Sequence, residues 1–253
     1  MQNLSIVEYH NGVYLKRNDI SEYGGCFGGK AECILDFISK AKTKKFVTCG
    51  SRDSLQCDIV SEMCENFGYE CHIFMPLGRS TPTINRIEKR KNTVIHKIDK
   101  GYTVVIKSRA KKFAEENDTT YIPFGMEHAT SIEIIAKQVA NIPKEVKRVV
   151  VPVGGGVTMC GIIKGLNDFK MHDKTVLGVM TGKRPDKLLK QFNCGISYKL
   201  VPYKENVSPL AMYSMITDYS IDGIKLDPIY EGKCYPFLED SDLLWIVGYH
   251  EVN

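Results

Sequence analysis

The sequence predicts an α/β protein built mainly on parallel sheets. Short apolar runs rich in β-branched residues alternate with segments whose apolar residues recur at helical spacing, and glycine-rich turns join several of these pairs. Strands that alternate with helices are typical of parallel sheets covered by helices. At 253 residues, with 43% hydrophobic and 25% charged residues, the chain is ordinary for a globular protein of one large or two modest domains.

The first half of the chain contains four expected strands, at residues 14–17, 46–49, 71–75 and 93–98. A helix is expected after Lys30, where apolar residues recur at helical spacing. A second helix begins near Leu55 and ends at Gly68, because glycine readily adopts the left-handed conformation that closes a helix. Residues 121–123 then lead into a turn at Gly125.

The second half is organised around residues 149–153, an almost unbroken β-branched run that suits a strand buried on both faces. Further strands are expected at residues 176–180, 198–202 and 243–247, and further helices around residues 132–139 and 209–219. The chain shows no internal repeat, linker or low-complexity tract.

The central strand ends at three glycines, Gly154, Gly155 and Gly156, and a helix begins at Val157 and Thr158. Glycines let a ligand approach the backbone closely, and the N–H groups at a helix N-terminus attract anions. This strand, turn and helix therefore predict a cradle for a phosphate.

Two better-known phosphate cradles do not fit this turn. The P-loop needs a Lys-Ser/Thr pair after its last glycine, and no such lysine follows Gly156. The dinucleotide fingerprint needs G-x-G-x-x-G spacing, which Gly154, Gly156 and Gly161 do not provide. The single phosphate of a small cofactor fits better, and a plain β–α turn is the alternative interpretation.

Other classes of protein are disfavoured by composition. No apolar run is long enough to span a bilayer, and the first residues do not resemble a signal peptide. The nine cysteines are scattered, odd in number and form no CxxC pair, so neither a disulfide framework nor a metal site is expected. We interpret them as buried thiols of a protein in the reducing cytoplasm.

Positive charge gathers between residues 86 and 112, where ten Lys or Arg residues stand against only Glu88 and Asp99. A solvated surface is one interpretation. A basic face for a polyanion such as a nucleic acid is the other.

Lys30 is the most suggestive single residue, because four glycines precede it within six positions. The backbone before Lys30 can therefore come close to a ligand bound to its amine. A lysine beside a helix N-terminus and other positive charge suits a nucleophile that forms a Schiff base. Taken alone, it could equally be a surface lysine that opens a helix.

Four blocks of sequence carry a resemblance to a known family. They read L-K-R-N-D-I followed by G-G-K, then G-S-R-D-S-L-Q, then V-P-V-G-G-G-V-T, and finally L-D-P-I-Y-E-G-K. In this order they resemble the 1-aminocyclopropane-1-carboxylate (ACC) deaminase and D-cysteine desulfhydrase family. That family belongs to the fold type II pyridoxal-phosphate enzymes, the tryptophan synthase β-like superfamily. The resemblance spans nearly the whole chain.

The resemblance implies a role for each matching residue on the cofactor side. Lys30 would hold the aldehyde of pyridoxal phosphate as an imine. The phosphate would be held by Gly154, Gly155, Gly156, Val157 and Thr158. Glu231 would lie against the pyridine nitrogen, where a carboxylate keeps the ring protonated and a strong acceptor of carbanion electrons. Desulfhydrase-like members carry threonine at that place, so Glu231 favours the deaminase branch.

On the substrate side the resemblance is weaker. Ser54 would meet the substrate carboxylate with Leu55 and Gln56 beside it, and Tyr230 would face the substrate. The family has asparagine at the place of Leu55, and its C-terminal H-T-G-G is replaced by residues 246–249. The cofactor anchors therefore look intact while the substrate side is altered.

We therefore expect a fold type II enzyme with two domains, a smaller one of residues 45–124 and a larger one of residues 1–44 and 125–253. The expected activity is pyridoxal-phosphate-dependent deaminase-like or lyase-like carbanion chemistry on a small amino acid, with Lys30, Ser54, Tyr230 and Glu231 as catalytic residues. The first alternative is an enzyme of the same kind acting on an amino acid attached to a larger molecule, such as a hypermodified DNA base. The second is a degenerate, non-catalytic binding protein. A homodimer is expected.

Overall fold

The computed structural model describes residues 3–99, 102–182, 184–192 and 195–250. Contacts divide these residues into two compact units. Unit 1 contains residues up to Ser21 and residues 128–249, and unit 2 contains residues 22–127 together with His250. Residues 22–44, which were expected in the larger domain, belong to unit 2.

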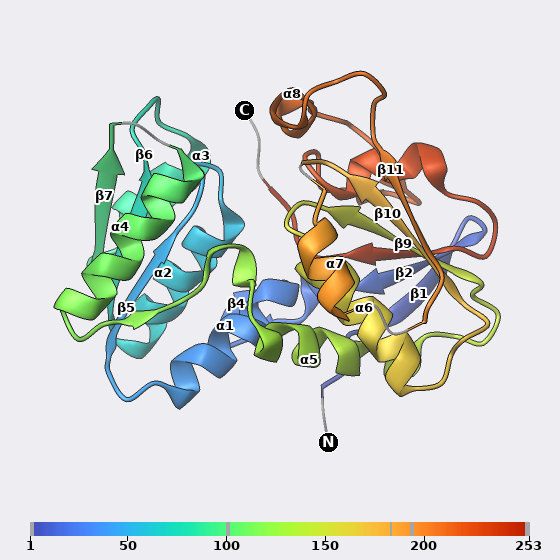
Figure 1. Cartoon of the computed structure of the whole chain (residues 1–253), viewed down its shortest axis with the longest axis horizontal. Coiled ribbons are helices and arrows are strands. Elements are labelled where there is room, and N and C mark those ends of the chain that lie inside the picture. The colour runs from blue at the N-terminus through green and yellow to red at the C-terminus, as the bar shows by residue number, and fades with distance from the viewer. Residues whose placement is uncertain (1–2, 100–101, 183, 193–194, 251–253) are drawn as a thin grey trace. The chain divides into compact units, whose positions relative to one another are not determined.

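Unit 1 is built on a six-stranded sheet with the order β1-β2-β14-β9-β10-β11 (Figure 1). Its strands are β1 (Val7–His10), β2 (Val13–Arg17), β9 (Arg148–Val153), β10 (Thr175–Met180), β11 (Tyr198–Pro202) and β14 (Leu243–Ile246). Only β1 runs antiparallel to its neighbour, and all other pairs are parallel. The sheet confirms the expected parallel α/β architecture and places β9, the central β-branched run, between β14 and β10.

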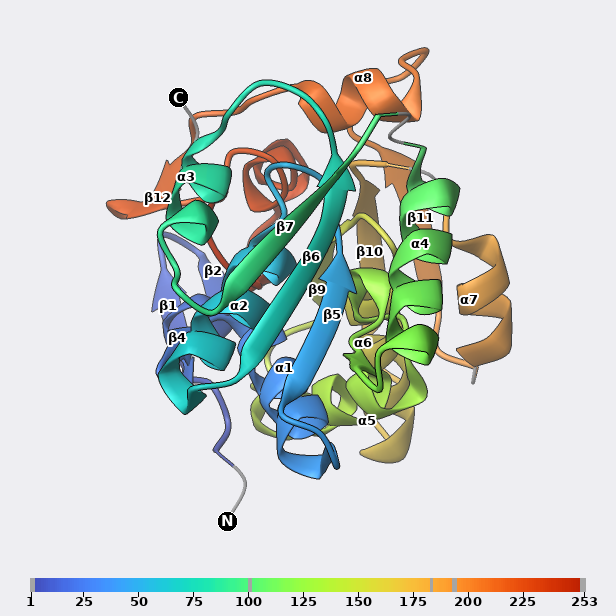
Figure 2. The same cartoon turned by 90° about the vertical axis from the view of Figure 1, so that its left-hand side faces the viewer.

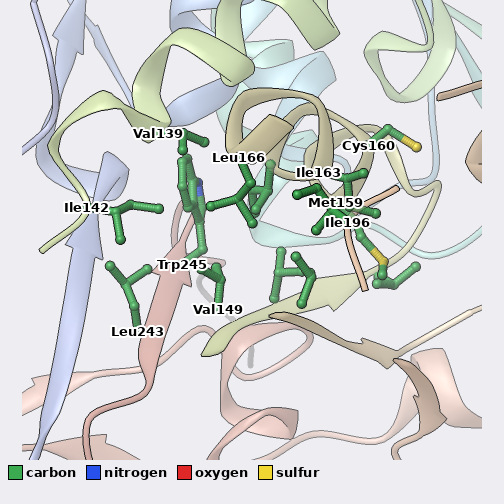
Figure 3. Close-up of a cluster of buried hydrophobic side chains, with 14 of the residues drawn as sticks. Val139, Ile142, Val149, Met159, Cys160, Ile163, Leu166, Ile196, Leu243 and Trp245 are labelled. Carbon is green, nitrogen blue, oxygen red and sulfur yellow. The ribbon is translucent and has the colours of Figure 1, made fainter. Parts of the chain in front are cut away.

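Both faces of this sheet are buried, which explains why β9 is apolar throughout. On one face, Val149, Val151 and Trp245 pack in a core with two helices, the one that follows the glycine turn and the one that precedes β9. Figure 3 shows Trp245 beside Val139 and Leu166. On the other face, Val150 and Leu244 pack in a second core with residues from the C-terminal third of the chain.

The helices of unit 1 are α5 (Ala129–Lys137), α6 (Val157–Asp168), α7 (Asp186–Phe192) and α8 (Pro209–Ser214). Two glycines of α6 let α5 approach closely, since a Cβ at Gly161 would lie 2.5 Å from Ile135 and one at Gly165 would overlap the Ala136 carbonyl. Helix α8 is shorter than the expected residues 209–219. It ends at Ser214 because Thr217 donates both its N–H and its hydroxyl to the carbonyl of Pro228 instead of continuing the helix.

Unit 2 is built on a parallel four-stranded sheet with the order β7-β6-β5-β8, of which Figure 2 shows β7, β6 and β5 side by side. Its strands are β5 (Lys45–Cys49), β6 (Glu70–Pro76), β7 (Thr93–Ile98) and β8 (Thr120–Tyr121). Its helices are α1 (Gly29–Lys40), α2 (Leu55–Phe67), α3 (Pro82–Glu88) and α4 (Thr103–Glu116). Helices α1 and α2 were expected from the sequence, the latter with Gly68 as its left-handed cap, whereas α3 and α4 were not.

The alternation of side chains along β5 places α2 and α4 on opposite faces of this sheet. Val47 and Cys49 pack with Ile106 of α4. Thr48, which points the other way, bonds to Gln56 of α2. The remaining elements are two short hairpins, β3 (Glu22–Tyr23) with β4 (Cys26–Phe27) and β12 (Ser220–Ile221) with β13 (Ile224–Lys225), and the 3-10 turns η1 (Asn18–Ile20), η2 (Phe124–Met126), η3 (Gln138–Asn141), η4 (Glu231–Lys233) and η5 (Tyr235–Phe237).

Candidate active site

The glycine turn of unit 1 connects β9 to α6 and is open at its centre. Gly156 has a φ of 89° and caps α6 without any side-chain hydrogen bond to the helix. A Cβ at Gly156 would lie 2.5 Å from Pro185, whereas a Cβ at Gly155 would meet nothing within 4 Å. Among the described residues, no side chain caps the backbone N–H groups at the start of α6, and there is room beside Gly155. This is the geometry of an anion site at a helix N-terminus.

The loop that contains Tyr230 lies against this turn. A Cβ at Gly154 would come within 3.2 Å of the Tyr230 ring. The loop is shaped by buried Asp227, whose Oδ1 accepts hydrogen bonds from the N–H groups of Ile229 and Tyr230, both at 2.8 Å. The structure therefore brings Gly154 and Tyr230, which are distant in the sequence, to one place.

Glu231 follows in the same loop and is a buried carboxylate with 1% exposure. Burial raises its pKa well above the usual value, the charge of Asp227 adds to this, and backbone N–H bonds oppose it. One of those bonds is donated by the Val247 N–H to Oε1 at 2.8 Å. A buried carboxyl of this kind is suited to a partner that shares or donates a proton.

Two residues that the sequence analysis missed support this loop. The amine of Lys233 is fully buried and donates to the carbonyls of Met212 at 2.7 Å and Tyr213 at 3.2 Å. The Tyr213 ring in turn meets the Tyr230 ring edge-on, with centroids 5.9 Å apart. Lys233 belongs to the quoted block L-D-P-I-Y-E-G-K, so its place in the motif was the available signal. Nothing in the sequence pattern marks Tyr213.

Lys30 lies in unit 2 as the second residue of α1. The helix begins after its N-cap Gly28, whose φ of 105° turns the chain into the helix. Its side chain is half-buried. Burial raises the pKa of the nearby Cys57 thiol to about 12, while the Ser54 hydroxyl and the charge of Lys30 oppose that rise. Lys30 and Ser54 follow separate loops in the sequence, and both lower the pKa of the same thiol, that of Cys57.

Ser54, Leu55 and Gln56 form the start of α2. The Ser54 hydroxyl accepts a hydrogen bond from the Cys57 N–H at 3.3 Å and so caps the helix. Gln56 is buried and donates both amide protons within unit 2, to Thr48 Oγ1 at 2.9 Å and to the Pro123 carbonyl at 2.7 Å. Half-buried Leu55 opens the helix. Substrate contacts for these three residues stay predictions.

Much of the basic stretch at residues 86–112 is engaged by carboxylates of its own unit. Arg86 and Arg90 both bond to buried Asp58, at 2.8 and 2.6 Å. Further ion pairs join Lys97 to Glu88, Lys107 to Glu127 and Lys112 to Glu116. These pairs favour the interpretation of this stretch as a solvated surface.

None of the helices in the described ranges is long and apolar enough to cross a membrane.

Solved structures share this fold at low sequence identity. An ACC deaminase homologue matches with a TM-score of 0.78 and 18% identity over 98% of this chain and 90% of its own. An L-serine ammonia-lyase of Rhizomucor miehei matches with a TM-score of 0.65 and 17% identity over 95% of this chain and 89% of its own. Maize serine racemase matches with a TM-score of 0.67 and 13% identity over 98% of this chain and 88% of its own. No curated protein sequence matches the chain.

The fold of these structures is the fold type II architecture expected from the four sequence blocks. The sequence profile described as "Pyridoxal-phosphate dependent enzyme" matches residues 2–229, which is most of the chain. This protein therefore belongs to the pyridoxal-phosphate-dependent enzyme family, whose cofactor is pyridoxal phosphate.

Proposed function

We propose that this enzyme acts on an amino acid in the manner of a deaminase or lyase, with Glu231 as the residue that most specifically supports this assignment. Glu231 is buried, its pKa is raised, and it lies in the loop whose Tyr230 packs on the glycine turn. A carboxyl group at this place is suited to hold a proton at the ring nitrogen of the cofactor.

The residues present in unit 1 fit pyridoxal phosphate. The open space at Gly155 and the uncapped start of α6 suit its phosphate, with Thr158 in the first turn of the helix. The carboxyl of Glu231 suits its ring nitrogen. When bound, the cofactor supplies a ring that accepts the electrons released when a bond at the substrate Cα is broken.

The remaining chemistry is assigned to residues of this chain. Lys30 would bond the aldehyde of the cofactor through Nζ, and the glycines before it leave room for that approach. The Ser54 hydroxyl would donate to the substrate carboxylate, helped by the N-terminus of α2. Tyr230, held by Asp227 and Tyr213, would exclude water from the side of the site next to the glycine turn.

The similar enzymes support amino acids as the substrate class, but they catalyse different reactions. The enzymes that share this fold include an L-serine ammonia-lyase, but also a serine racemase. We favour deamination or elimination because the carboxylate at position 231 follows the deaminase branch of the family. In that branch the ring nitrogen is expected to stay protonated, so that the ring accepts the negative charge released when the bond at the substrate Cα breaks.

The test begins with the purified protein and added pyridoxal phosphate. We expect a visible absorption band that Lys30→Ala removes. The loaded enzyme is then given ACC, D-cysteine, L-serine and L-threonine, and keto acid, ammonia and the opposite enantiomer are measured separately. Keto acid with ammonia supports the proposal. The opposite enantiomer alone would replace it with racemisation, and a colourless protein would point to the non-catalytic alternative.

A substrate carried on a nucleic acid is the remaining alternative, and the ion pairs of Arg86 and Arg90 do not favour it. If free amino acids leave the spectrum unchanged while DNA or RNA binds with a strong salt dependence, that alternative replaces ours. The homodimer also stays a prediction, which sedimentation can test.

A further inference from the structure

Arg52 lies at the carboxyl edge of the unit 2 sheet, where β5 and β6 both end. It belongs to the loop after β5, and its guanidinium lies over Gly78 in the loop after β6, so closely that a Cβ at Gly78 would overlap Nη1. The Arg52 carbonyl accepts a hydrogen bond at 2.8 Å from the hydroxyl of Thr81, which is 6% exposed. The neighbouring loop thus positions both the backbone and the side chain of Arg52.

Among the described residues of unit 2, no carboxylate pairs with this cation. The half-buried guanidinium of Arg52 makes no hydrogen bond or ion pair with the described residues of unit 2. Arg86 and Arg90 of the same unit differ, because both bond to Asp58. A partly desolvated guanidinium is suited to an anionic ligand, because the oxygens of the anion replace the hydration that burial removes.

Arg52 and Ser54 come from one turn but face different neighbours. The turn is closed by the Ser54 N–H, which donates to the Ser51 carbonyl at 3.2 Å. The Ser54 hydroxyl lies toward Gly50, where a Cβ would be 2.6 Å from it, while the guanidinium of Arg52 lies toward Gly78. One loop therefore offers two separate groups that can bind anions, a hydroxyl at the start of α2 and a guanidinium beside it.

We propose that Arg52 binds a second anionic group of the amino-acid substrate, a carboxylate or a phosphate on its side chain. This inference rests on the proposed function, in which Ser54 meets the α-carboxylate. Arginine suits such a subsite because its planar fork binds carboxylate and phosphate oxygens through two parallel hydrogen bonds. Gly78 is the second determinant of the subsite, since any side chain there would displace the fork.

The experiment uses the enzyme loaded with pyridoxal phosphate and matched pairs of amino acids in both enantiomers. Alanine is compared with aspartate, and serine with O-phosphoserine. The apparent Kd is read from the change in the visible spectrum of the cofactor, so turnover is not needed. We expect the acidic member of at least one pair to bind about 10-fold to 100-fold more tightly, as for a hydrogen bond to a charged group. The aspartate and O-phosphoserine arms distinguish a carboxylate from a phosphate.

Three variants make the test specific. Arg52→Gln should abolish the preference for the acidic member while alanine and serine bind as before. Gly78→Ala should weaken it similarly although the net charge is unchanged. Arg79→Gln, which removes an exposed cation next to Gly78, should keep it.

Equal binding of neutral and acidic amino acids, or a preference that survives Arg52→Gln, would overturn the subsite and leave the proposed function standing. Loss of the preference in Arg79→Gln to the same extent would also overturn it, since the effect would then be one of overall charge. If no amino acid changes the spectrum at all, the proposed function fails and the subsite fails with it.

Discussion

The loop at residues 227–231 of unit 1 and the loop at residues 51–56 of unit 2 carry most of the side chains assigned to the site, and they are held in different ways. In the first, buried Asp227 fixes the backbone and Glu231 is almost fully enclosed. In the second, a single turn precedes α2, and Arg52, Ser54 and Leu55 remain half-buried. Buried, hydrogen-bonded groups tolerate little change, whereas half-buried loop residues can be exchanged without loss of the fold. This difference agrees with the sequence, in which the block proposed for the cofactor side keeps the family pattern and the block proposed for the substrate side departs from it.

The largest effect is expected from Lys30→Ala, because it removes the only proposed covalent attachment of the cofactor. The visible band should vanish, and turnover of the true substrate should fall on the order of 1,000-fold or more. Absorption spectra before and after gel filtration would measure the attachment. A variant that keeps the band would move the covalent role to another lysine.

Glu231→Gln should separate cofactor binding from chemistry. The amide cannot keep the ring nitrogen protonated, and the charge it would have stabilised appears mainly in the transition state. We expect kcat to fall about 100-fold with little change in KM, and the cofactor band to remain. Full activity in this variant would leave the family's cofactor binding intact and remove the deaminase-like assignment.

Gly155→Val tests the phosphate cradle of unit 1. Since a Cβ at Gly155 meets none of the described residues within 4 Å, the apo variant should melt at the wild-type temperature, while affinity for pyridoxal phosphate falls about 10-fold or more. Gly161→Ala is the matched control, because its Cβ would press on Ile135 and should lower the melting temperature instead. Unchanged cofactor affinity in a folded Gly155→Val protein would contradict the cradle.

The smallest effect concerns Lys233, whose pKa burial lowers to about 8 from the usual 10.5. A lowered pKa means that the folded state disfavours the protonated amine. The contribution of Lys233 to the free energy of unfolding should therefore be constant below pH 8 and rise between about pH 8 and 10.5.

Urea unfolding of the wild type and of Lys233→Met across this range would isolate that contribution, because cysteine and tyrosine titrations cancel in the difference. A difference that does not change with pH would contradict the lowered pKa of Lys233. Unfolding at pH 6 and 7 is the control, because the difference in free energy of unfolding between the two proteins should be the same at both pH values.

Much of the fold could be predicted from local patterns in the sequence. The β9 strand, the glycine turn and α6 could be predicted because a β-branched run, three glycines and a helical apolar spacing follow one another without interruption. Helix α4 was missed because its Lys and Arg residues obscured the few apolar residues, of which Ile106 and Ala110 are buried. The end of α8 was misplaced because it depends on a bond from Thr217 to Pro228, eleven residues along the chain.

By itself, the sequence determined the parallel α/β class, the glycine turn and the family blocks, because each depends on neighbours within one element. Only the tertiary structure decided which of those groups meet. It placed Tyr230 on Gly154, paired Arg86 and Arg90 with Asp58, and turned both amide protons of Gln56 inward. It also placed Arg52 over Gly78 without a carboxylate partner among the described residues of unit 2. These outcomes depend on burial and on residues that are distant along the chain, and no spacing in the sequence encodes them.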